Sequence, residues 1–280
     1  MDIKKQLHEL GLHPSKKSGQ CFLLDQKILE RIAAAGRLKK DDTVLEIGSG
    51  PGNLTRLLAP AAGRVVTIEN DRSMIPLLHK NVGPANNVQF IRDDVIRWRK
   101  QQPSALSHRG YLIVANIPYY LTSLIIREFL SQKPQPVRLV LLVQAEVADR
   151  IVAQPGEHSL LSLSVQFYGA VEKLFMVPRT SFWPPPEVDS AVVRITVKRE
   201  PQSSDRDFFR FLRVGFSARR KQLHNNLSAG FHLTRERLTE LFDKCKVPQN
   251  ARAQELSLAQ WGALYELSKN SLMANIGKSH

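Results

Sequence analysis

The segment NIPYY, Asn116–Tyr120, combines residue types that could act on an amine. It follows an apolar, β-branched run, Tyr111–Ala115, that predicts a buried strand. The amide oxygen of Asn116, and carbonyl oxygens oriented by Pro118, could accept both hydrogens of an exocyclic amine. An adenine amine held in this way would have its lone pair free to attack an electrophilic methyl group. Tyr119 could stack on the base, which is worth roughly 1–3 kcal/mol.

The alternative for NIPYY is a turn that ends a strand and buries two core tyrosines. It accounts for a proline and an aromatic residue, but not for all four residue types together. The proposed chemistry requires no strongly basic side chain, because a methylated ammonium loses its proton readily. Positioning and desolvation would supply most of the catalysis.

A glycine-rich loop, LEIGSGPGNLT, follows an earlier predicted strand and opens a helix. Gly48, Gly50 and Gly52 allow a tight turn and a close approach to a ligand. Asn53 stands where the dinucleotide fingerprint has its last glycine. The loop therefore favours a smaller nucleoside ligand, and a dehydrogenase is the weakest interpretation.

Two acidic residues follow the next two predicted strands. Glu69 comes 17 residues after Gly52, where a carboxylate can accept from both ribose hydroxyls; an exposed strand-end acid is the alternative. Asp94 could accept from an adenine amino group, but Asp93 and Asp94 could equally form a turn and a helix cap. The glycine loop, Glu69, Asp94 and Asn116 all follow strands, and ligands of open α/β sheets bind at those ends.

The elements that must position these residues alternate along most of the chain. Strands are predicted at 43–47, 64–69, 87–91, 111–115, 137–143 and 190–197, and helices at 25–38, 53–58, 72–80, 122–130 and 144–153. This alternation predicts an α/β fold, a largely parallel sheet with helices on both faces. The first ~20 residues are basic and polar and predict a mobile arm.

A polar segment, Lys198–Asp205, ends this alternation, and only amphipathic helices are predicted beyond it. Residues 198–280 carry 15 basic and 8 acidic residues, which is half of the formal net charge of +14. We therefore expect an α/β domain with a basic N-terminal arm, residues 1–198, and a small all-α domain, residues 199–280. The second domain would face a polyanion; evenly solvated helices are the alternative.

The composition limits the class of protein. A chain of 280 residues, 42% of them hydrophobic, suits one large domain and one small one. A sequence pI near 10.0 favours nucleic acid as partner, with a basic surface or an anionic membrane as alternatives. The apolar runs are too short to span a bilayer, and no signal core is present, so we expect a cytoplasmic protein. Cys21 and Cys245 form neither a disulfide framework nor a zinc site; we expect no metal and no more than a monomer.

Six segments follow one another in an order that is typical of one family: SGQCFLLD, EIGSGPGNLT, VTIENDR, RDDV, NIPYYLTS and FWPPPEVDSAVVR. From about Ser18 to Leu267 the chain resembles the KsgA-type (RsmA) small-subunit rRNA adenine N6-dimethyltransferases. The resemblance implies a Rossmann-like methyltransferase domain that uses S-adenosyl-L-methionine as methyl donor. It implies as substrate two adjacent adenosines in a hairpin loop near the 3′ end of small-subunit (16S) rRNA, and as partner the immature small ribosomal subunit.

The resemblance also assigns roles to residues of this sequence. The residues implied to cover the methionine part of the cofactor are Gln20, Cys21, Phe22 and Leu23. Those implied to line the rest of the cofactor are Gly48, Gly50, Glu69, Asp94, Val95 and Asn116. The target amine would be held by Asn116, Ile117, Pro118 and Tyr119. Phe182 would close on the opposite face of a base that has left its stack.

Cys21 departs from the family pattern, which usually has Asn or His at this position. A thiol hydrogen-bonds the carboxylate or amine of the donor only weakly, so either the backbone makes the contact or cofactor affinity is lower.

The segment FSARRKQLHNNL, residues 216–227, predicts one helix and resembles the F-x-x-R-R-K segment of the family. The cations expected to contact RNA phosphates are Arg219, Arg220 and Lys221, with Lys16 and Lys17 of the arm.

Two other functions stay open from the sequence. One is the related macrolide-resistance methylase of 23S rRNA, which the FxPPPxVDSAVV segment and the basic helical tail make less favoured. The other is a ribosome-assembly or transcription factor that uses the fold without catalysis. The intact NIPY segment argues against a purely non-catalytic factor, although checkpoint binding and catalysis can coexist.

Overall fold

The chain divides into two compact units, which we describe separately. The computed structural model describes residues 2–14, 20–106 and 110–276. The first unit comprises residues 1–149 and 168–200, and the second comprises residues 150–167 and 201–280. The predicted division at 198/199 did not assign residues 150–167 to the helical part. They group with it because their side chains, such as Leu163, pack into its hydrophobic core.

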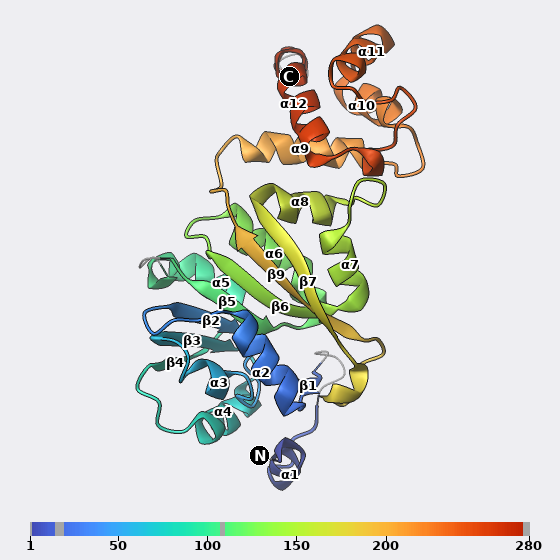
Figure 1. Ribbon diagram of the computed structural model, residues 1–280. Coiled ribbons are helices and arrows are strands. Elements are labelled where there is room, and N and C mark those ends of the chain that lie inside the picture. Colours follow the sequence, from blue (N-terminus) through green and yellow to red (C-terminus); the bar gives the residue numbers. More distant parts are fainter. Residues whose placement is uncertain (1, 15–19, 107–109, 277–280) are drawn as a thin grey trace. The chain divides into compact units, whose positions relative to one another are not determined.

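The first unit is built on a seven-stranded sheet (Figure 1). Its strands are β2 (Thr43–Ile47), β3 (Arg64–Glu69), β4 (Val88–Arg92), β5 (Leu112–Asn116), β6 (Arg138–Gln144), β7 (Gly169–Val177) and β9 (Ser190–Val197). The strand order is β4-β3-β2-β5-β6-β9-β7. Neighbours from β4 to β6 are parallel, whereas β9 is antiparallel to both β6 and β7. The largely parallel sheet is therefore confirmed, and β7 is a strand that the sequence analysis missed.

The chain changes direction across this sheet at β2. It runs outward from β2 to β3 and β4, and then returns to place β5 on the other side of β2. A crevice forms at such a switch point, outside the carboxyl ends of the strands. This topology brings the ends of β2, β3, β4 and β5 to one edge of the sheet.

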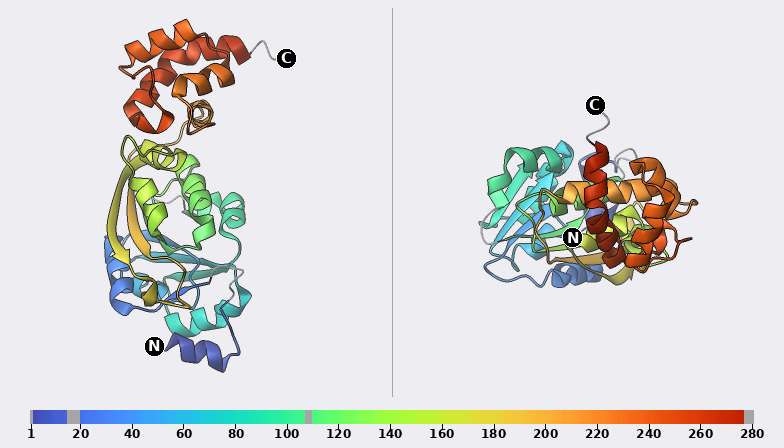
Figure 2. Two further views of the ribbon diagram at one scale, coloured as in Figure 1. Left: turned by 90° about the vertical axis from the view of Figure 1, so that its right-hand side faces the viewer. Right: turned by 90° about the horizontal axis from the view of Figure 1, so that it is seen from above.

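Helices cover both faces of the sheet, as predicted (Figures 1 and 2). In chain order they are α2 (Gln26–Ala35), α3 (Thr55–Leu58), α4 (Ile75–Val82), α5 (Val95–Gln101), α6 (Thr122–Ser131) and α7 (Ala145–Val152). α2 begins at an N-cap, Asp25, whose side chain accepts from the backbone N–H of Ile28. α2 and α3 contribute to one core with β2, β3 and β6.

The N-terminal arm is more ordered than predicted. Residues Ile3–Glu9 form α1, with Asp2 as N-cap. Ile3 and Leu7 lie four residues apart on one face of the helix, and Leu7 is 0% exposed. Both pack in a cluster with Phe22, Met74 and Leu77. The mobile arm is therefore wrong for this segment, while Lys16 and Lys17 lie outside the described residues.

A short antiparallel pair joins two segments that are far apart in the sequence. β1 (Phe22–Leu23) pairs with β8 (Phe182–Trp183), so that Leu23 lies opposite Phe182. Strands of two residues leave no periodic signal, and the sequence analysis did not predict them. The pairing places Phe22 and Leu23 beside Phe182 and Trp183, the first two residues of the FWPPPEVD segment.

The second unit contains helices and no strand in its described part. Its helices are α8 (Leu160–Tyr168, whose last residue belongs to the first unit), α9 (Asp205–Gly215), α10 (Leu223–Phe231), α11 (Arg235–Lys244) and α12 (Leu258–Ile276). Phe211, Phe242 and Trp261 are fully buried in its core. The small all-α region predicted after residue 198 is therefore confirmed for residues 201–276.

The segment 216–227 does not form one helix as predicted. α9 ends at Gly215 and α10 begins only at Leu223. The side-chain amide of Asn226 donates to the carbonyl oxygens of Gly215, at 2.6 Å, and Ala218, at 3.2 Å, and so stabilises a turn. Phe216 stacks on Trp261, with ring centroids 5.7 Å apart. The connection between the two helices carries the cations Arg219, Arg220 and Lys221, which are exposed as predicted.

Candidate active site

A cavity of about 500 Å³ lies at the switch point of the first unit. Most of its lining comes from five segments: residues 20–23, the glycine loop after β2, residues 68–71 at the end of β3, residues 93–95 after β4 and residues 116–121 at the end of β5. All predicted cofactor residues lie on it, namely Gln20, Cys21, Phe22, Leu23, Gly48, Gly50, Glu69, Asp94, Val95 and Asn116. Ile117, Pro118 and Tyr119 also line it. One site therefore unites residues that the sequence spreads over about 100 positions.

The glycine loop has the conformation that its glycines predict. Gly48, Gly50 and Gly52 all have positive φ, at 72°, 52° and 89°. The side-chain amide of Asn53 donates to the carbonyl oxygen of Leu23 at 2.8 Å. Asn53 thus ties the glycine loop to β1, which gives a structural reason for an amide at this position.

Backbone N–H groups hold the carboxylate of Glu69 in the cavity lining. It is 8% exposed, so the alternative of an exposed strand-end acid is wrong. One carboxylate oxygen accepts from the N–H of Gly50 at 2.7 Å, and the other accepts from the N–H of Asp71 at 2.8 Å. Burial raises the pKa of Glu69, and these two hydrogen bonds partly oppose that rise. Each oxygen keeps a further lone pair with which to accept from a ligand hydroxyl.

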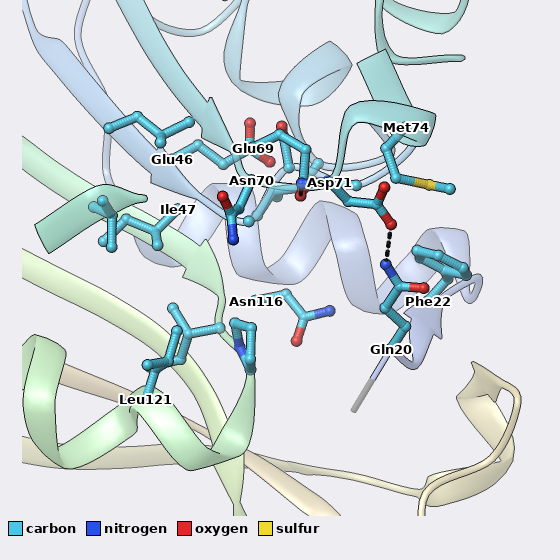
Figure 3. Close-up of a pocket in the computed structure, with 18 of the residues that line it drawn as sticks. Gln20, Phe22, Glu46, Ile47, Glu69, Asn70, Asp71, Met74, Asn116 and Leu121 are labelled. Carbon is cyan, nitrogen blue, oxygen red and sulfur yellow. Dashed lines mark hydrogen bonds between the residues drawn. The ribbon is translucent and has the colours of Figure 1, made fainter. Parts of the chain in front are cut away.

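Gln20 and Asp71 form a contact that the sequence analysis did not predict. The amide of Gln20 donates to Oδ2 of Asp71 at 2.6 Å, which joins the segment before β1 to the loop after β3 (Figure 3). Oδ1 of Asp71 accepts from both the N–H and the hydroxyl of Ser73. Burial alone would raise the pKa of Asp71, but the hydrogen bonds from Ser73 and Gln20 lower it overall. Asp71 follows the end of β3 by two residues and precedes Ser73 by two, and this Asp-x-Ser spacing is the local signal that could have identified the turn.

Asp94 lies on the cavity and is also a helix cap. Its Oδ1 accepts from the N–H groups of Ile96, at 3.0 Å, and Arg97, at 2.9 Å, at the start of α5. The cap that the sequence left as an alternative is therefore confirmed. Since both cap bonds use Oδ1, Oδ2 is not required for the cap. Asp93 accepts from the Arg97 guanidinium, so that an ion pair supports the same turn.

Asn116 is the last residue of β5, and its side chain projects into the cavity (Figure 3). Figure 3 shows Glu69 and Asn70 above it and Gln20 and Phe22 to its right. Pro118 follows with φ −55° and its carbonyl oxygen accepts from the N–H of Leu121 at 2.9 Å. This bond closes the short 3₁₀ turn Tyr119–Leu121.

The two tyrosines of NIPYY have different environments. The hydroxyl of Tyr119 lies 2.7 Å from Oγ of Ser190, and burial raises the pKa of this phenol. Tyr120 is 70% exposed, so the alternative of two core tyrosines is wrong. Both residues line the cavity.

Phe182 and Cys21 were also predicted to act at the site. Phe182 is 5% exposed, packs in the core that contains Leu23 and is not among the residues that line the cavity. The role of Phe182 at the target base stays a prediction. Cys21 does line the cavity, and burial raises the pKa of its thiol, which keeps the thiol neutral at neutral pH.

Glu46 is a cavity residue that the sequence analysis missed. It lies in the buried strand β2 and is 1% exposed. Its Oε2 accepts from the hydroxyls of Thr55, at 2.6 Å, and Thr67, at 3.1 Å. Burial raises the pKa of Glu46 to about 7, and the nearby Glu69 adds to the rise. An acidic residue at a buried position of the strand TVLEI is the signal that could have found it.

The raised pKa of Glu46 predicts a pH-dependent stability. Between about pH 4.5 and 7, the folded protein keeps a proton that the unfolded chain releases. The free energy of unfolding should therefore fall as the pH rises through this range, by up to about 3 kcal/mol, and this contribution should level off above it. Glu46→Gln cannot ionise and should flatten the fall, as measured by urea unfolding at pH 5 and pH 8. Equal pH dependence in both proteins would show that Glu46 is ionised in the folded state.

Neither a metal-binding cluster nor a membrane-spanning helix is found among the described residues. Among residues 2–14, 20–106 and 110–276, no group of three or more His, Cys, Asp or Glu side chains is placed to hold a metal ion. Within the same residues, no helix has the length and apolar character that crossing a bilayer requires. The donor set of the cavity, with carboxylates, amides and apolar side chains around a glycine loop, fits a nucleoside ligand.

Comparisons with known proteins agree with this site. The family described as ribosomal RNA adenine dimethylase matches residues 12–270 of the chain. A ribosomal RNA small subunit methyltransferase A from Dehalococcoides mccartyi is 37% identical over 269 residues, covering 93% of this chain and 90% of the relative. The protein of the same name from Desulfitobacterium hafniense is 38% identical over 266 residues, covering 94% and 95%.

Two solved structures have the same fold over nearly the whole chain. A dimethyladenosine transferase from Plasmodium falciparum has a TM-score of 0.72 at 28% identity and covers 89% of this chain and 98% of its own. The 23S rRNA methyltransferase ErmE has a TM-score of 0.69 at 26% identity and covers 90% and 99%.

Proposed function

The chain belongs to the ribosomal RNA adenine dimethylase family and is an S-adenosylmethionine-dependent rRNA adenine dimethyltransferase, and we propose that it modifies small-subunit rRNA. The proposed targets are the N6 atoms of two adjacent adenosines in the hairpin loop near the 3′ end of that rRNA. The observation that carries the proposal is the position of Asn116 in the same cavity as Glu69 and the glycine loop. The names of the relatives at 37–38% identity favour the small subunit over the 23S substrate named for ErmE.

The proposed donor site uses the upper part of the cavity. Glu69 would accept from the ribose hydroxyls, and Asp94 from the adenine amino group of the donor. Gln20–Leu23 would cover the methionine part, with Gln20 held in place by Asp71. When bound, the donor supplies an electrophilic methyl group on a sulfonium. The neutral thiol of Cys21 adds no charge to this end of the site.

The proposed role of Asn116 is to orient the amine that is methylated. Its side-chain oxygen, together with a backbone carbonyl of the NIPYY turn, would accept the two amine hydrogens and direct the nitrogen lone pair towards the methyl group. A nitrogen–carbon bond forms as the sulfur–carbon bond breaks, and the resulting ammonium releases a proton to water. After one transfer a single hydrogen remains for Asn116, and after two none remains. The loss of both hydrogen bonds favours release of the dimethylated product.

Labelling separates the proposed substrate from the 23S alternative. Small and large ribosomal subunits from a strain without this enzyme class would be incubated with the protein and radiolabelled S-adenosylmethionine. We expect label in the small subunit only. Label in the large subunit would instead assign the chain to the macrolide-resistance type of activity, and tight small-subunit binding without label would favour a non-catalytic assembly role.

The second unit carries the proposed RNA-binding surface. Arg219, Arg220 and Lys221 are exposed in the connection between α9 and α10. α9 adds an exposed row of arginines at i, i+4 and i+7: Arg206, Arg210 and Arg213. Like charges at this spacing destabilise a helix slightly, and no ion pair with another described residue offsets the effect. The row is therefore better explained by an anionic partner than by helix stability.

Replacing Arg219, Arg220 and Lys221 together by glutamine should weaken binding to small ribosomal subunits. Loss of three phosphate contacts should also lower the slope of log affinity against log salt concentration by about 2–3. Filter binding at several salt concentrations measures both quantities.

A matched control removes the same charge from another helix of the second unit, α11. Arg237 and Lys244 on α11 both pair with Glu240 and are thereby partly neutralised. The control replaces these two residues and Arg235 by glutamine and should leave the salt slope nearly unchanged. Equal slopes for the two triple variants would show that RNA binds elsewhere and that only net charge matters.

The proposal also covers the compartment and the oligomeric state of the enzyme. An enzyme whose substrate is the immature small ribosomal subunit would work in the cytoplasm. Asn116, Glu69 and the glycine loop line one cavity within the first unit, so we propose that a monomer suffices.

A further inference from the structure

Tyr120 is a large aromatic side chain exposed at the cavity. Its 70% exposure is the highest among the exposed large hydrophobic residues in the described part of the chain, and it is the one aromatic residue among them. Of that group, which includes Val137 and Val188, Tyr120 is also the one that lines the cavity. A tyrosine at this exposure adds little to the hydrophobic core, so its position calls for another explanation.

The backbone beneath this ring is fixed. Pro118 restricts φ, and the hydrogen bond from the N–H of Leu121 to the carbonyl oxygen of Pro118 closes the turn. The adjacent Tyr119 is anchored through its hydroxyl to Ser190. Tyr120 therefore presents a free ring from a rigid turn, four residues after Asn116. A ring presented in this way loses little conformational entropy when it stacks on a ligand.

The proposed substrate has an unstacked face at this place. An adenosine that enters the cavity must leave its base stack, and its departure exposes the face of the neighbouring base. Unstacking costs a few kcal/mol, which an aromatic side chain can recover in part, at roughly 1–3 kcal/mol per base. Stacking tolerates any base, because every base has a π-face.

We propose that Tyr120 stacks on the base of the nucleotide next to the target adenosine. This inference rests on the proposed function. Tyr119 and Asn116 then contact the target base, and Tyr120 stacks on the base of the adjacent nucleotide. Because stacking does not depend on base identity, the same ring serves when either of the two adjacent adenosines is the target. Tyr120 is a substrate-binding residue in this account and takes no part in methyl transfer.

The test compares Tyr120→Phe, which keeps the ring, with Tyr120→Leu, which keeps apolar bulk but loses the π-face. Methyl transfer to unmethylated small subunits is measured with labelled S-adenosylmethionine. Stacking is present in both the bound complex and the transition state, so its loss should raise KM with little change in kcat. We expect kcat/KM of Tyr120→Leu to fall roughly tenfold and that of Tyr120→Phe to stay within about twofold of the original protein.

Two controls separate binding from folding. The affinity for S-adenosylmethionine and the thermal midpoint of Tyr120→Leu should match those of the original protein, because the side chain is exposed. Val137→Ser changes another exposed apolar residue, which does not line the cavity, and should leave KM unchanged.

Three outcomes would overturn the inference: an unchanged KM for Tyr120→Leu, a fall in kcat at constant KM, or an equal loss with Tyr120→Phe. The unaltered protein is assayed first. If it fails to label the small subunit, the proposed function is wrong. If it labels the subunit and Tyr120→Leu behaves identically, only the role of Tyr120 is wrong.

Discussion

Asn116→Ala is expected to lower the rate of methyl transfer by roughly 100- to 1,000-fold and to leave the affinity for S-adenosylmethionine nearly unchanged. The magnitude is that of removing one preorganised hydrogen-bonding group from an active site. Without the amide oxygen, the target amine keeps its lone pair delocalised in the adenine ring, and its nitrogen is no longer directed at the methyl group. Single-turnover transfer to small subunits measures the rate, and isothermal titration calorimetry measures the affinity.

The cavity offers a matched control for this variant. Asn70 lines the same cavity beside Glu69 (Figure 3), so that Asn70→Ala removes the same amide from a residue that is not proposed to hold the target amine. Its rate of methyl transfer at saturating donor should stay close to that of the unaltered protein. If Asn116→Ala loses donor affinity in proportion to its rate, Asn116 is a donor-binding residue rather than the residue that orients the amine.

Glu69→Ala is expected to weaken binding of S-adenosylmethionine by roughly 100-fold or more. The carboxylate would lose two charge-assisted hydrogen bonds to the ribose, each worth about 1.5–3 kcal/mol. The N–H groups of Gly50 and Asp71 would also lose their acceptor, which loosens the glycine loop. Calorimetric titration with the donor measures the affinity directly.

The same carboxylate predicts a pH dependence of donor binding. Because burial raises the pKa of Glu69, part of the protein holds it protonated at acidic pH, and a protonated carboxyl has one acceptor fewer. Donor affinity should therefore increase as the pH rises through this raised pKa. Glu69→Gln, which does not titrate, should bind weakly at every pH. An affinity of Glu69→Ala equal to that of the unaltered protein would refute the role of Glu69.

The sequence predicted the site largely because its polar residues stand at strand ends. Glu69 and Asn116 close β3 and β5, and Asp94 follows β4 by two residues. Periodicity identified these strands, and the geometry of a parallel sheet brings their carboxyl ends to one edge. Neither step needs knowledge of long-range contacts. The residues that were predicted from strand position therefore lie together on one cavity.

The features that were missed depend on contacts between distant segments. The bond between Gln20 and Asp71, 51 positions apart, has no local signature. The antiparallel pairing of Leu23 with Phe182 likewise joins segments that are far apart in the sequence. The helix predicted across residues 216–227 failed because Asn226 bonds to backbone carbonyls of the preceding turn. In the first two cases the contact joins distant segments, and in the third a side-chain bond to the backbone of the adjoining turn interrupts the predicted helix.

The most direct test of the account maps the methylated nucleosides. Small subunits from a strain without this enzyme class are incubated with the protein and labelled S-adenosylmethionine, and the rRNA is digested and sequenced at the labelled positions. The account predicts N6-dimethyladenosine at two adjacent positions in the hairpin loop near the 3′ end of the small-subunit rRNA. Label at any other nucleotide, or at an atom other than N6, would contradict it.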